Sequence, residues 1–386
     1  MADKQALEKR LESLIKGNSP ENRKKHALAA KKKGQKVIGL LCDYAPEEVI
    51  YAAGMLPWRV TGTWDSDLSK AAVYRDLDSC RYCTHTLESL LRGDLSFLDG
   101  IVTSDWDDDR RRLFDTWRYI SHPPFAVIYT APKNTSEITE RYFAKEIAKM
   151  VATLEEFGKV KVTPEKLQEA IEIYNKTRTL LSQLYELRKR PAPPVTGAEV
   201  LGITTTAMVM EKVEFNKELE ALLPYIEQRK TSHKASEPRL LLSSDMLDNP
   251  QFVEIIEGEG CQIVMDDLDT GSRWFYKLVD AYSADAIQAI ARRYCWRPHD
   301  PIGFNWEEQI QQIVEWVRDW RVDGVIELFE EFSPARQWRA PLLVRELAKF
   351  NIPLVRISRG YDVGSIEQLK TRVAAFLEML PTGLKV

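Results

Sequence analysis

The sequence predicts an α/β protein built from two doubly wound lobes, each a Rossmann or flavodoxin-like unit with a small parallel sheet. Helices bridge the lobes, and a helical extension precedes the first one. Two observations support this prediction. The chain has 386 residues, which is more than a single hydrophobic core usually organises. In addition, one order of short apolar run, polar loop and helix occurs twice along the chain, as expected for an internal repeat.

The helical extension is predicted over residues 1–34, where leucines recur at helical spacing until Gly34 ends the pattern. The first lobe is predicted over residues 35–135. Pro46 and the two glutamates after it are typical of a helix start, which predicts a helix over residues 47–53. The predicted strands of this lobe are residues 36–41, 58–61, 98–103 and 125–129.

The second lobe is predicted over residues 236–386 because it repeats the order of the first. Asn249 and Pro250 begin its first helix. Its predicted strands are residues 240–243, 261–265, 322–327 and 353–357. Between the lobes, residues 136–235 are rich in helix formers, and a proline-rich break at residues 190–195 divides them into two helical stretches.

Composition excludes several classes of protein. The chain is 44% hydrophobic and 29% charged, with a formal net charge of −4, as in ordinary globular proteins. The only basic block is residues 31–33, so nucleic-acid binding is not expected. The N-terminus lacks the apolar stretch of a secretory signal, and no apolar run is long enough for a membrane span. Five scattered cysteines do not suggest a disulfide framework, so we expect a cytoplasmic protein.

Ligands of open parallel sheets bind in the loops that follow the carboxyl ends of the strands. That rule selects four segments, which are residues 42–48, 64–83, 104–112 and 330–336. The second segment ends in Cys80 and Cys83, a CxxC spacing with His85 close behind. Two thiolates at this spacing could bind a metal or cluster, form a redox dithiol, or pack as buried thiols.

Two further segments combine charged side chains in a way that could bind anions. Residues 105–112 contain four aspartates and three arginines, which either cap the next helix or bind a partner or an anionic cofactor. Residues 292–299 mix arginine, aromatic and thiol side chains and could bind phosphates, although arginines are also common at helix ends. Glycine-rich phosphate loops and the nucleophile elbow of hydrolases are absent from the sequence.

Four segments together carry a resemblance to a known family. They are residues 42–57, Cys80 with residues 91–100, residues 292–298, and residues 368–378. Their order and the repeat resemble the subunits of the benzoyl-CoA reductase and 2-hydroxyacyl-CoA dehydratase family, of the dehydratase D-component type. The resemblance implies an oxygen-sensitive heterodimer that binds an acyl-CoA between this chain and a homologous partner subunit. It also implies [4Fe-4S] clusters held by cysteines, and an ATP-dependent iron–sulfur activator that supplies low-potential electrons.

The sequence departs from that family at two ligand positions. Members that hold a cluster carry one cysteine near Cys80 and two more after later strands, at positions that fall here at Trp106 or Asp107 and at Ser333. Either Asp107 or Ser333 substitutes through oxygen, or Cys42 and Cys83 rearrange the site, or the partner subunit holds most of the cluster. The candidate cofactor-binding residues are Cys80, Cys83, Cys42, Trp106, Asp107 and Ser333. Cys80 and Cys83 are the metal-ligand candidates, and no catalytic residue is assigned.

The resemblance leaves three functions open. Trp58, Trp64 and Trp106 near the expected crevice would suit an aromatic acyl group, and equally a subunit interface. The first hypothesis is therefore a subunit of an ATP-dependent aromatic acyl-CoA reductase of the benzoyl-CoA type, as used in anaerobic aromatic degradation. The alternatives are a subunit of a 2-hydroxyacyl-CoA dehydratase that forms a ketyl radical, and a bilobed module that binds a small acid without chemistry.

Overall fold

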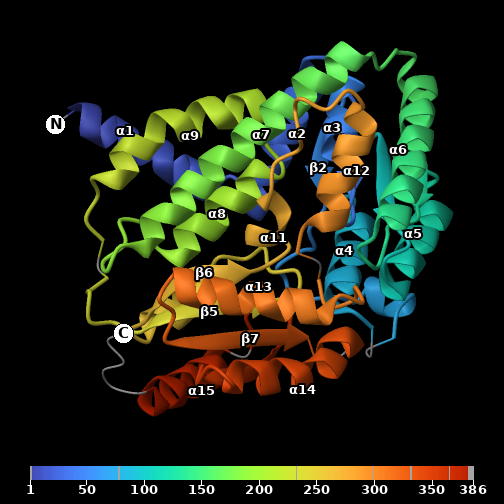
Figure 1. The fold of residues 1–386 in the computed structure, drawn as a ribbon. Helices are drawn as coiled ribbons and strands as arrows, with labels where there is room; N and C mark the ends of the chain where they lie inside the picture. The colour runs from blue at the N-terminus through green and yellow to red at the C-terminus, as the bar shows by residue number, and fades with distance from the viewer. Residues whose placement is uncertain are drawn as a thin grey trace.

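The computed structural model describes residues 2–76, 79–231, 233–298, 300–330, 333–364 and 366–380. It confirms the predicted fold class, because the described strands form two four-stranded parallel sheets in two α/β lobes (Figure 1). The strand orders are β2-β1-β3-β4 and β6-β5-β7-β8. The same order in both sheets is the structural counterpart of the internal repeat in the sequence.

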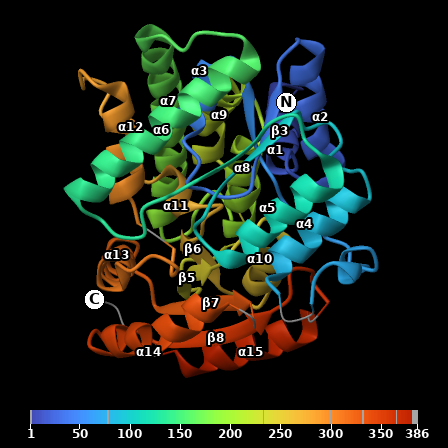
Figure 2. The same ribbon diagram turned by 90° about the vertical axis from the view of Figure 1, so that its right-hand side faces the viewer.

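The first sheet contains the shortest strands, and β1, β2 and β3 are completely buried because helices cover both faces of a parallel sheet. Its strands are β1 (Val37–Leu40), β2 (Leu56–Arg59), β3 (Gly100–Ser104) and β4 (Ala126–Tyr129). The helices of this lobe are α3 (Glu47–Ala52), η1 (Ala71–Val73), α4 (Arg81–Leu91) and α5 (Asp108–Ser121), of which α4 and α5 pack against each other (Figure 2). The predicted strand at residues 58–61 lies two residues earlier, where Leu56 pairs with Val37.

The second sheet has longer strands, and β7 pairs with β5 over residues 324–328. Its strands are β5 (Arg239–Ser244), β6 (Gln262–Asp267), β7 (Gly324–Glu330) and β8 (Leu354–Arg359). The helices of this half are α10 (Gln251–Gly258), α11 (Ser272–Phe275), α12 (Ala286–Trp296), α13 (Trp306–Asp319), α14 (Pro334–Ala348) and α15 (Ile366–Met379). Helix α12 packs against α6 of the bridge rather than against its own sheet (Figure 1).

The bridge consists of two helical stretches on either side of the proline-rich break. They are α6 (Glu137–Gly158) and α7 (Pro164–Glu186) with η2 (Leu187–Lys189), then α8 (Gly197–Ala207) and α9 (Lys212–Glu227). The N-terminal extension is α1 (Ala2–Ile15) and α2 (Pro20–Lys32), separated where Pro20 begins the second helix. Leu11 and Leu14 lie in one core with α7, α8 and α9, so α1 is an integral part of the bridge (Figure 1).

None of the described helices combines the length and the apolar character that a bilayer span requires. The long bridge helices instead begin with side-chain caps. Ser136 forms a capping box at the start of α6, and Thr163 caps α7 just before Pro164. These caps fix where each helix begins.

One partly buried histidine ties the bridge to the second lobe and predicts a pH-dependent stability. His233 Nδ1 lies 2.8 Å from Glu237 Oε2, and its Nε2 lies 3.4 Å from Glu257 Oε1. Burial by itself would lower the pKa of His233, but the two glutamates outweigh burial and raise it. Because the folded pKa is raised, the stabilisation is complete below the ordinary histidine pKa and is lost as the pH rises through the folded pKa.

We therefore expect the melting temperature to fall between about pH 6 and pH 9 by more in the wild type than in His233→Gln. Thermal unfolding followed by circular dichroism across this range measures the difference. His122→Asn is the matched control, because His122 is exposed and sits in a left-handed conformation that asparagine tolerates. Parallel pH profiles for the wild type and His233→Gln would contradict the prediction.

Candidate functional site

Loops that follow the carboxyl ends of strands in the two sheets contact each other, and we call this buried interface between the lobes the interlobe crevice. Gly62 N, just after β2, donates to Tyr361 Oη, just after β8, at 3.0 Å. Trp64 Nε1 donates to Asp248 Oδ2 at 3.0 Å. The crevice selected by the rule for open sheets is therefore lined by both halves of the chain.

Seven buried charged residues from both lobes form what we call the interlobe charge cluster. Each is at most 8% exposed. Three of them follow or end strands β1, β2 and β6, two lie on α5 and α11, and two follow α12. The members are Asp43, Arg59, Arg110, Asp269, Arg273, Arg297 and Asp300.

Ion pairs in this cluster cross from one lobe to the other. Arg297 Nη2 donates to Asp43 Oδ2 at 2.7 Å, and Arg59 Nη2 donates to Asp269 Oδ2 at 3.0 Å. Burial would raise the pKa of Asp43, but the guanidinium groups of Arg297 and Arg59 outweigh burial and lower it to about 2. Asp43 is therefore a carboxylate at neutral pH.

Asp300 behaves in the opposite way. Its Oδ1 accepts hydrogen bonds from Trp106 Nε1 at 2.7 Å and from the backbone N of Ile302 at 2.9 Å. Burial and the negative charge of Asp43 raise the pKa of Asp300 to about 6, because they outweigh the nearby arginines. Asp43 is thus a permanent carboxylate, whereas Asp300 is a carboxyl group that exchanges a proton in a physiological pH range.

Several polar atoms of the cluster have no hydrogen-bond partner within the described residues. They are Asp43 Oδ1, Arg59 Nε, Arg110 Nη1, Asp269 Oδ1, Arg273 Nε and Arg297 Nε. Buried polar atoms are normally paired with protein or with ordered water, and unpaired ones often mark functional positions. The cluster can therefore bind a small polar group through both donors and acceptors.

We expect Asp300→Asn to raise the free energy of unfolding at pH 7.5 by about 2–3 kcal/mol, which corresponds to the raised pKa. A carboxyl with a raised folded pKa costs stability once the pH exceeds its ordinary value near 4, and asparagine removes that cost while it can still accept from Trp106. Urea unfolding at pH 5 and pH 7.5 measures the effect, with the exposed Asp108→Asn as control. An Asp300→Asn protein that is less stable than the wild type at pH 7.5 would contradict the expectation.

Cys80 and Cys83, the predicted metal ligands, lie one turn apart at the start of α4, where Cys80 is the N-cap. Cys80 Sγ donates to Glu330 Oε2 of the second lobe at 3.6 Å, and Arg81 N donates to the same oxygen at 3.0 Å. A hydrogen bond with Cys83, burial and the charge of Glu330 raise the pKa of the Cys80 thiol well above its usual value. The crevice therefore brings the two cysteines together with Glu330, but favours the neutral thiol of Cys80.

The other predicted residues have separate roles. Cys42 Sγ lies 3.5 Å from Tyr129 Oη, in a core cluster that does not include Cys80 and Cys83. Trp106 is buried and stacks on Tyr44, with ring centroids 4.1 Å apart.

Asp107 caps α5 by accepting from Arg110 N at 2.7 Å, as the capping interpretation of residues 105–112 predicts. Ser333 begins α14, and its backbone N donates to Glu330 O at 3.1 Å. Asp107 and Glu330 both raise the pKa of the Cys80 thiol, so both carboxylates lie on the Cys80 side of the crevice.

These positions do not fit a complete cluster site. A cluster is held by several cysteine thiolates, whereas of the described cysteines only Cys80 and Cys83 lie together here. In the ranges that the structure describes, no three His, Cys, Asp or Glu side chains are placed to hold a metal ion. Cys80 and Cys83 remain the predicted thiol ligands, and we derive no reaction step from a cluster at this position.

Sequence reasoning missed Arg59, Asp269, Arg273 and Asp300. The loop after β6 is not among the four selected segments, although it ends a strand of the repeat and contains Asp269. Applying the same rule to every strand of the second lobe would have found it. For residues 292–299, the structure places Arg297 in the charge cluster, and His299 lies outside the described residues.

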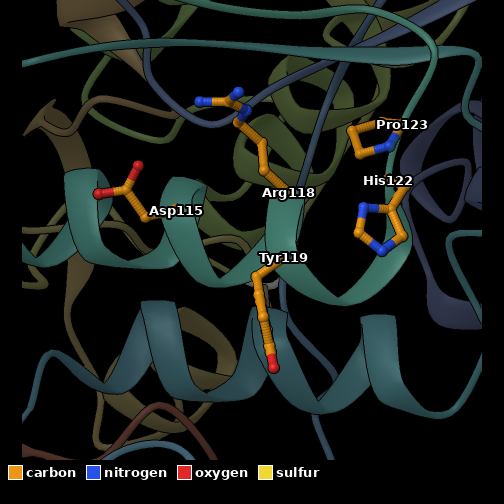
Figure 3. Close-up of a pocket in the computed structure, with 5 residues that line it drawn as sticks. All are labelled: Asp115, Arg118, Tyr119, His122 and Pro123. Atoms are coloured by element: carbon orange, nitrogen blue, oxygen red, sulfur yellow. The ribbon is translucent and has the colours of Figure 1, made fainter.

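A hollow of about 440 Å³ on the outer surface of α5 is a weaker candidate (Figure 3). Asp115, Arg118, Tyr119 and His122 line it, and Tyr119 is 77% exposed. Figure 3 shows that these side chains point in different directions rather than toward a common point. The interlobe crevice, where charges converge, is therefore the better candidate site.

Comparison with known proteins matches nearly the whole chain. A family model described as 2-hydroxyglutaryl-CoA dehydratase, D-component, matches residues 42–380. The β subunit of (R)-phenyllactyl-CoA dehydratase from Clostridium sporogenes is 27% identical over 93% of this chain and 96% of that protein. One of the subunits of benzoyl-CoA reductase from Thauera aromatica is 23% identical, covering 90% and 91%. The β subunit of (R)-2-hydroxyglutaryl-CoA dehydratase from Acidaminococcus fermentans is 24% identical, covering 91% and 94%.

Proposed function

Because this chain belongs to the 2-hydroxyglutaryl-CoA dehydratase D-component family, we propose that it is one subunit of a complex that converts an acyl-CoA thioester. The match over residues 42–380 carries this proposal, since it includes both lobes and the crevice between them. The relatives described above are each named as one subunit, which supports a partner subunit for this chain as well.

The proposed reaction is the dehydration of a 2-hydroxyacyl-CoA to the corresponding enoyl-CoA and water. The family description and two relatives named as dehydratase β subunits support it. Reduction of an aromatic acyl-CoA is the second candidate, supported by the relative named as a subunit of benzoyl-CoA reductase. The tryptophans do not distinguish dehydration from reduction, because Trp58 and Trp106 are buried within the protein and Trp64 donates a hydrogen bond to Asp248.

In this proposal the interlobe charge cluster is the part of the chain that faces the thioester. Arg59, Arg110 and Arg273 each have a buried N–H without a partner in the described ranges. Guanidinium groups held in a water-poor site stabilise negative charge that develops on a carbonyl oxygen. Asp300, with its pKa of about 6, can hold a proton at the same place.

The [4Fe-4S] cluster that the resemblance implies would be held mainly by the homologous partner subunit, since Cys80 and Cys83 are the only paired thiols near the described crevice. When bound, such a cluster supplies single electrons at low potential. An ATP-dependent activator would deliver those electrons. The chain described here would bind and orient the thioester and exclude water.

Anaerobic affinity purification of the full chain with its co-purifying proteins tests the proposal. We expect a homologous chain of similar size, and turnover of a 2-hydroxyacyl-CoA after one priming reduction. Consumption of reductant in proportion to product, with an aromatic acyl-CoA, would favour the reductase. Absence of iron, sulfide and turnover from every complex would contradict both reactions and favour the small-acid binding module.

A further inference from the structure

Cys80 and Cys83 share a hydrogen bond between their thiols, and we call these two residues the α4 thiol pair. All five cysteines of the chain are among the described residues, and each is a free thiol. Cys42 and Cys295 lie in one other core cluster, and Cys261 lies in another. No third cysteine of this chain therefore joins the α4 thiol pair, and a different chemistry has to be considered for it.

The α4 thiol pair stands at the N-terminus of a helix. Cys80 is the N-cap of α4 and Cys83 is its third residue, so the two side chains lie on the same turn. The backbone N of Thr84 donates to Cys80 O at 3.1 Å and closes this turn. A disulfide joins cysteines whose Cα atoms are about 4.4–6.8 Å apart, a separation that one helical turn provides. A CxxC spacing at such a position is typical of redox dithiols.

The two thiols differ in exposure. Cys80 is partly exposed, whereas Cys83 is fully buried. A small disulfide in solution can therefore reach the sulfur of Cys80 but not that of Cys83. Because Cys83 lies within hydrogen-bonding distance of Cys80, it can attack Cys80 once that sulfur has formed a mixed disulfide. The pair thus contains an attacking cysteine and a resolving cysteine.

The thiol of Cys80 is also a contact between the two lobes. Its Sγ donates to Glu330 Oε2 at 3.6 Å, and Arg81 N donates to the same oxygen at 3.0 Å. Glu330 is buried, Arg359 Nη2 lies 3.9 Å from its Oε1, and that oxygen has no hydrogen-bond partner within the described residues. A disulfide has no S–H group, so oxidation would remove one donor from a buried carboxylate that has few.

We propose that Cys80 and Cys83 are a redox-active dithiol that exchanges with low-molecular-weight disulfides, rather than ligands of a complete iron–sulfur cluster. Oxidation of this dithiol removes the hydrogen bond from Cys80 to Glu330 and weakens the contact between the lobes. The inference does not depend on the proposed acyl-CoA reaction.

The exchange has two balanced steps. The sulfur of Cys80 attacks the external disulfide, whose S–S bond breaks, and one thiol leaves with the hydrogen of Cys80. The sulfur of Cys83 then attacks the mixed disulfide at Cys80, and the second thiol leaves with the hydrogen of Cys83. The two cysteine sulfurs are oxidised to one disulfide, and the external disulfide is reduced to two thiols.

Mixtures of oxidised and reduced glutathione test the inference on the full chain, purified anaerobically with its co-purifying proteins. The hydrogen bond with Cys83 and burial raise the pKa of the Cys80 thiol, so exchange is slow and each mixture is followed until it stops changing. Acid quenching, alkylation of the remaining thiols after denaturation and peptide mass spectrometry then locate the disulfide. We expect a Cys80–Cys83 disulfide in oxidising mixtures, its reversal by dithiothreitol, and alkylation of the other three cysteines.

Single serine variants separate the two roles. Cys83→Ser should retain glutathione on Cys80, because no resolving thiol remains, whereas Cys80→Ser should take up none, because Cys83 is buried. Cys261→Ser is the matched control, since serine keeps a donor for the backbone oxygen of Ile256, and it should oxidise like the wild type. Thermal unfolding shows whether each variant is folded, and the wild-type disulfide map tests the pair without any substitution.

Glu330→Gln tests the link to the second lobe. Glutamine can still accept from Cys80 but without a charge, so it should stabilise the reduced pair less than the carboxylate does. We expect the glutathione ratio at half oxidation to move about fivefold toward reducing mixtures, as for the weakening of one charge-assisted hydrogen bond. The exposed Glu367→Gln is the control and should leave the ratio unchanged.

Several outcomes would overturn the inference. One is that both cysteines of the α4 thiol pair remain open to alkylation in the most oxidising mixture. Another is equal uptake of glutathione by Cys80→Ser and Cys83→Ser. A third is iron in the purified complex that is lost on Cys83→Ser, which would identify the pair as cluster ligands. A half-oxidation ratio that Glu330→Gln does not change would overturn the link to the contact between the lobes.

Discussion

Replacing Glu327 with Gln is expected to lower the free energy of unfolding by about 3–5 kcal/mol, the range measured when one partner of a buried ion pair is removed. Glu327 lies on β7 and is fully buried. Its Oε1 accepts from Arg336 at 3.2 Å and from Arg339 at 2.8 Å, and its Oε2 accepts from Arg356. Glutamine keeps the shape of the side chain but removes the charge that compensates these arginines.

The pH dependence gives a second, independent readout. Burial would raise the pKa of Glu327, but Arg339 and Arg336 outweigh burial and lower it. The stabilisation is therefore present above the ordinary glutamate pKa and is lost as the pH falls through the lowered folded value. The difference between wild type and Glu327→Gln should shrink in acid.

Urea unfolding at pH 7.5 and pH 4 measures both effects. Glu367→Gln is the control, because Glu367 is 86% exposed in its pair with Lys370 and should change stability by less than about 0.5 kcal/mol. The expectation is contradicted if Glu327→Gln lowers the free energy of unfolding at pH 7.5 by no more than this control does. The positive charges of the arginines would then not need the carboxylate of Glu327.

Replacing Arg297 with Met is expected to be equally severe, and to affect the crevice as well. The Arg297 side chain is fully buried, and its guanidinium lies 4.3 Å from the ring centroid of Tyr44. Methionine would leave Asp43 buried without its closest cation, at a cost of about 3–5 kcal/mol. Because Asp43 would keep only Arg59, Arg110 and Arg273 nearby, its pKa should rise.

A double-mutant cycle with Asp43→Asn separates this pair from the rest of the cluster. If the two residues interact directly, the double variant should be more stable than the sum of the single changes predicts, by about 0.5–3 kcal/mol. Chemical denaturation of the four proteins measures the coupling, and Arg112→Met, whose side chain is 71% exposed, controls for the substitution itself. Additive effects of Asp43→Asn and Arg297→Met would show that no direct coupling exists.

The fold could be predicted from the sequence because its signals are local. Each strand is a short apolar run that ends in a polar loop. Prolines such as Pro46 and Pro164 mark helix starts, because proline is tolerated in the first turn of a helix. The duplication of these local signals predicted two lobes with a small parallel sheet each, and the structure shows that the two sheets also share one strand order. The exact strand ends were less certain, since pairing with a neighbour, as for Leu56 with Val37, decides them.

The candidate site was predicted only in part. The rule for open sheets selected the loops that contain Asp43, Asp107 and Glu330, which follow the carboxyl ends of strands in the two sheets. It did not show that Glu330 would meet Cys80, which lies 250 positions earlier in the chain. No local sequence pattern around Cys80 indicates that the carboxylate of Glu330, from the other lobe, lies beside it.

The sequence by itself determined the class of fold, the repeat and the resemblance to a family, since these depend on the order of residues along the chain. Only the tertiary structure decided which charges become partners. Asp43 and Arg297 are 254 positions apart, and Arg59 and Asp269 are 210 apart. Electrostatic interaction depends on distance and burial in space rather than on separation in sequence, so the interlobe charge cluster exists only once the two lobes have folded against each other.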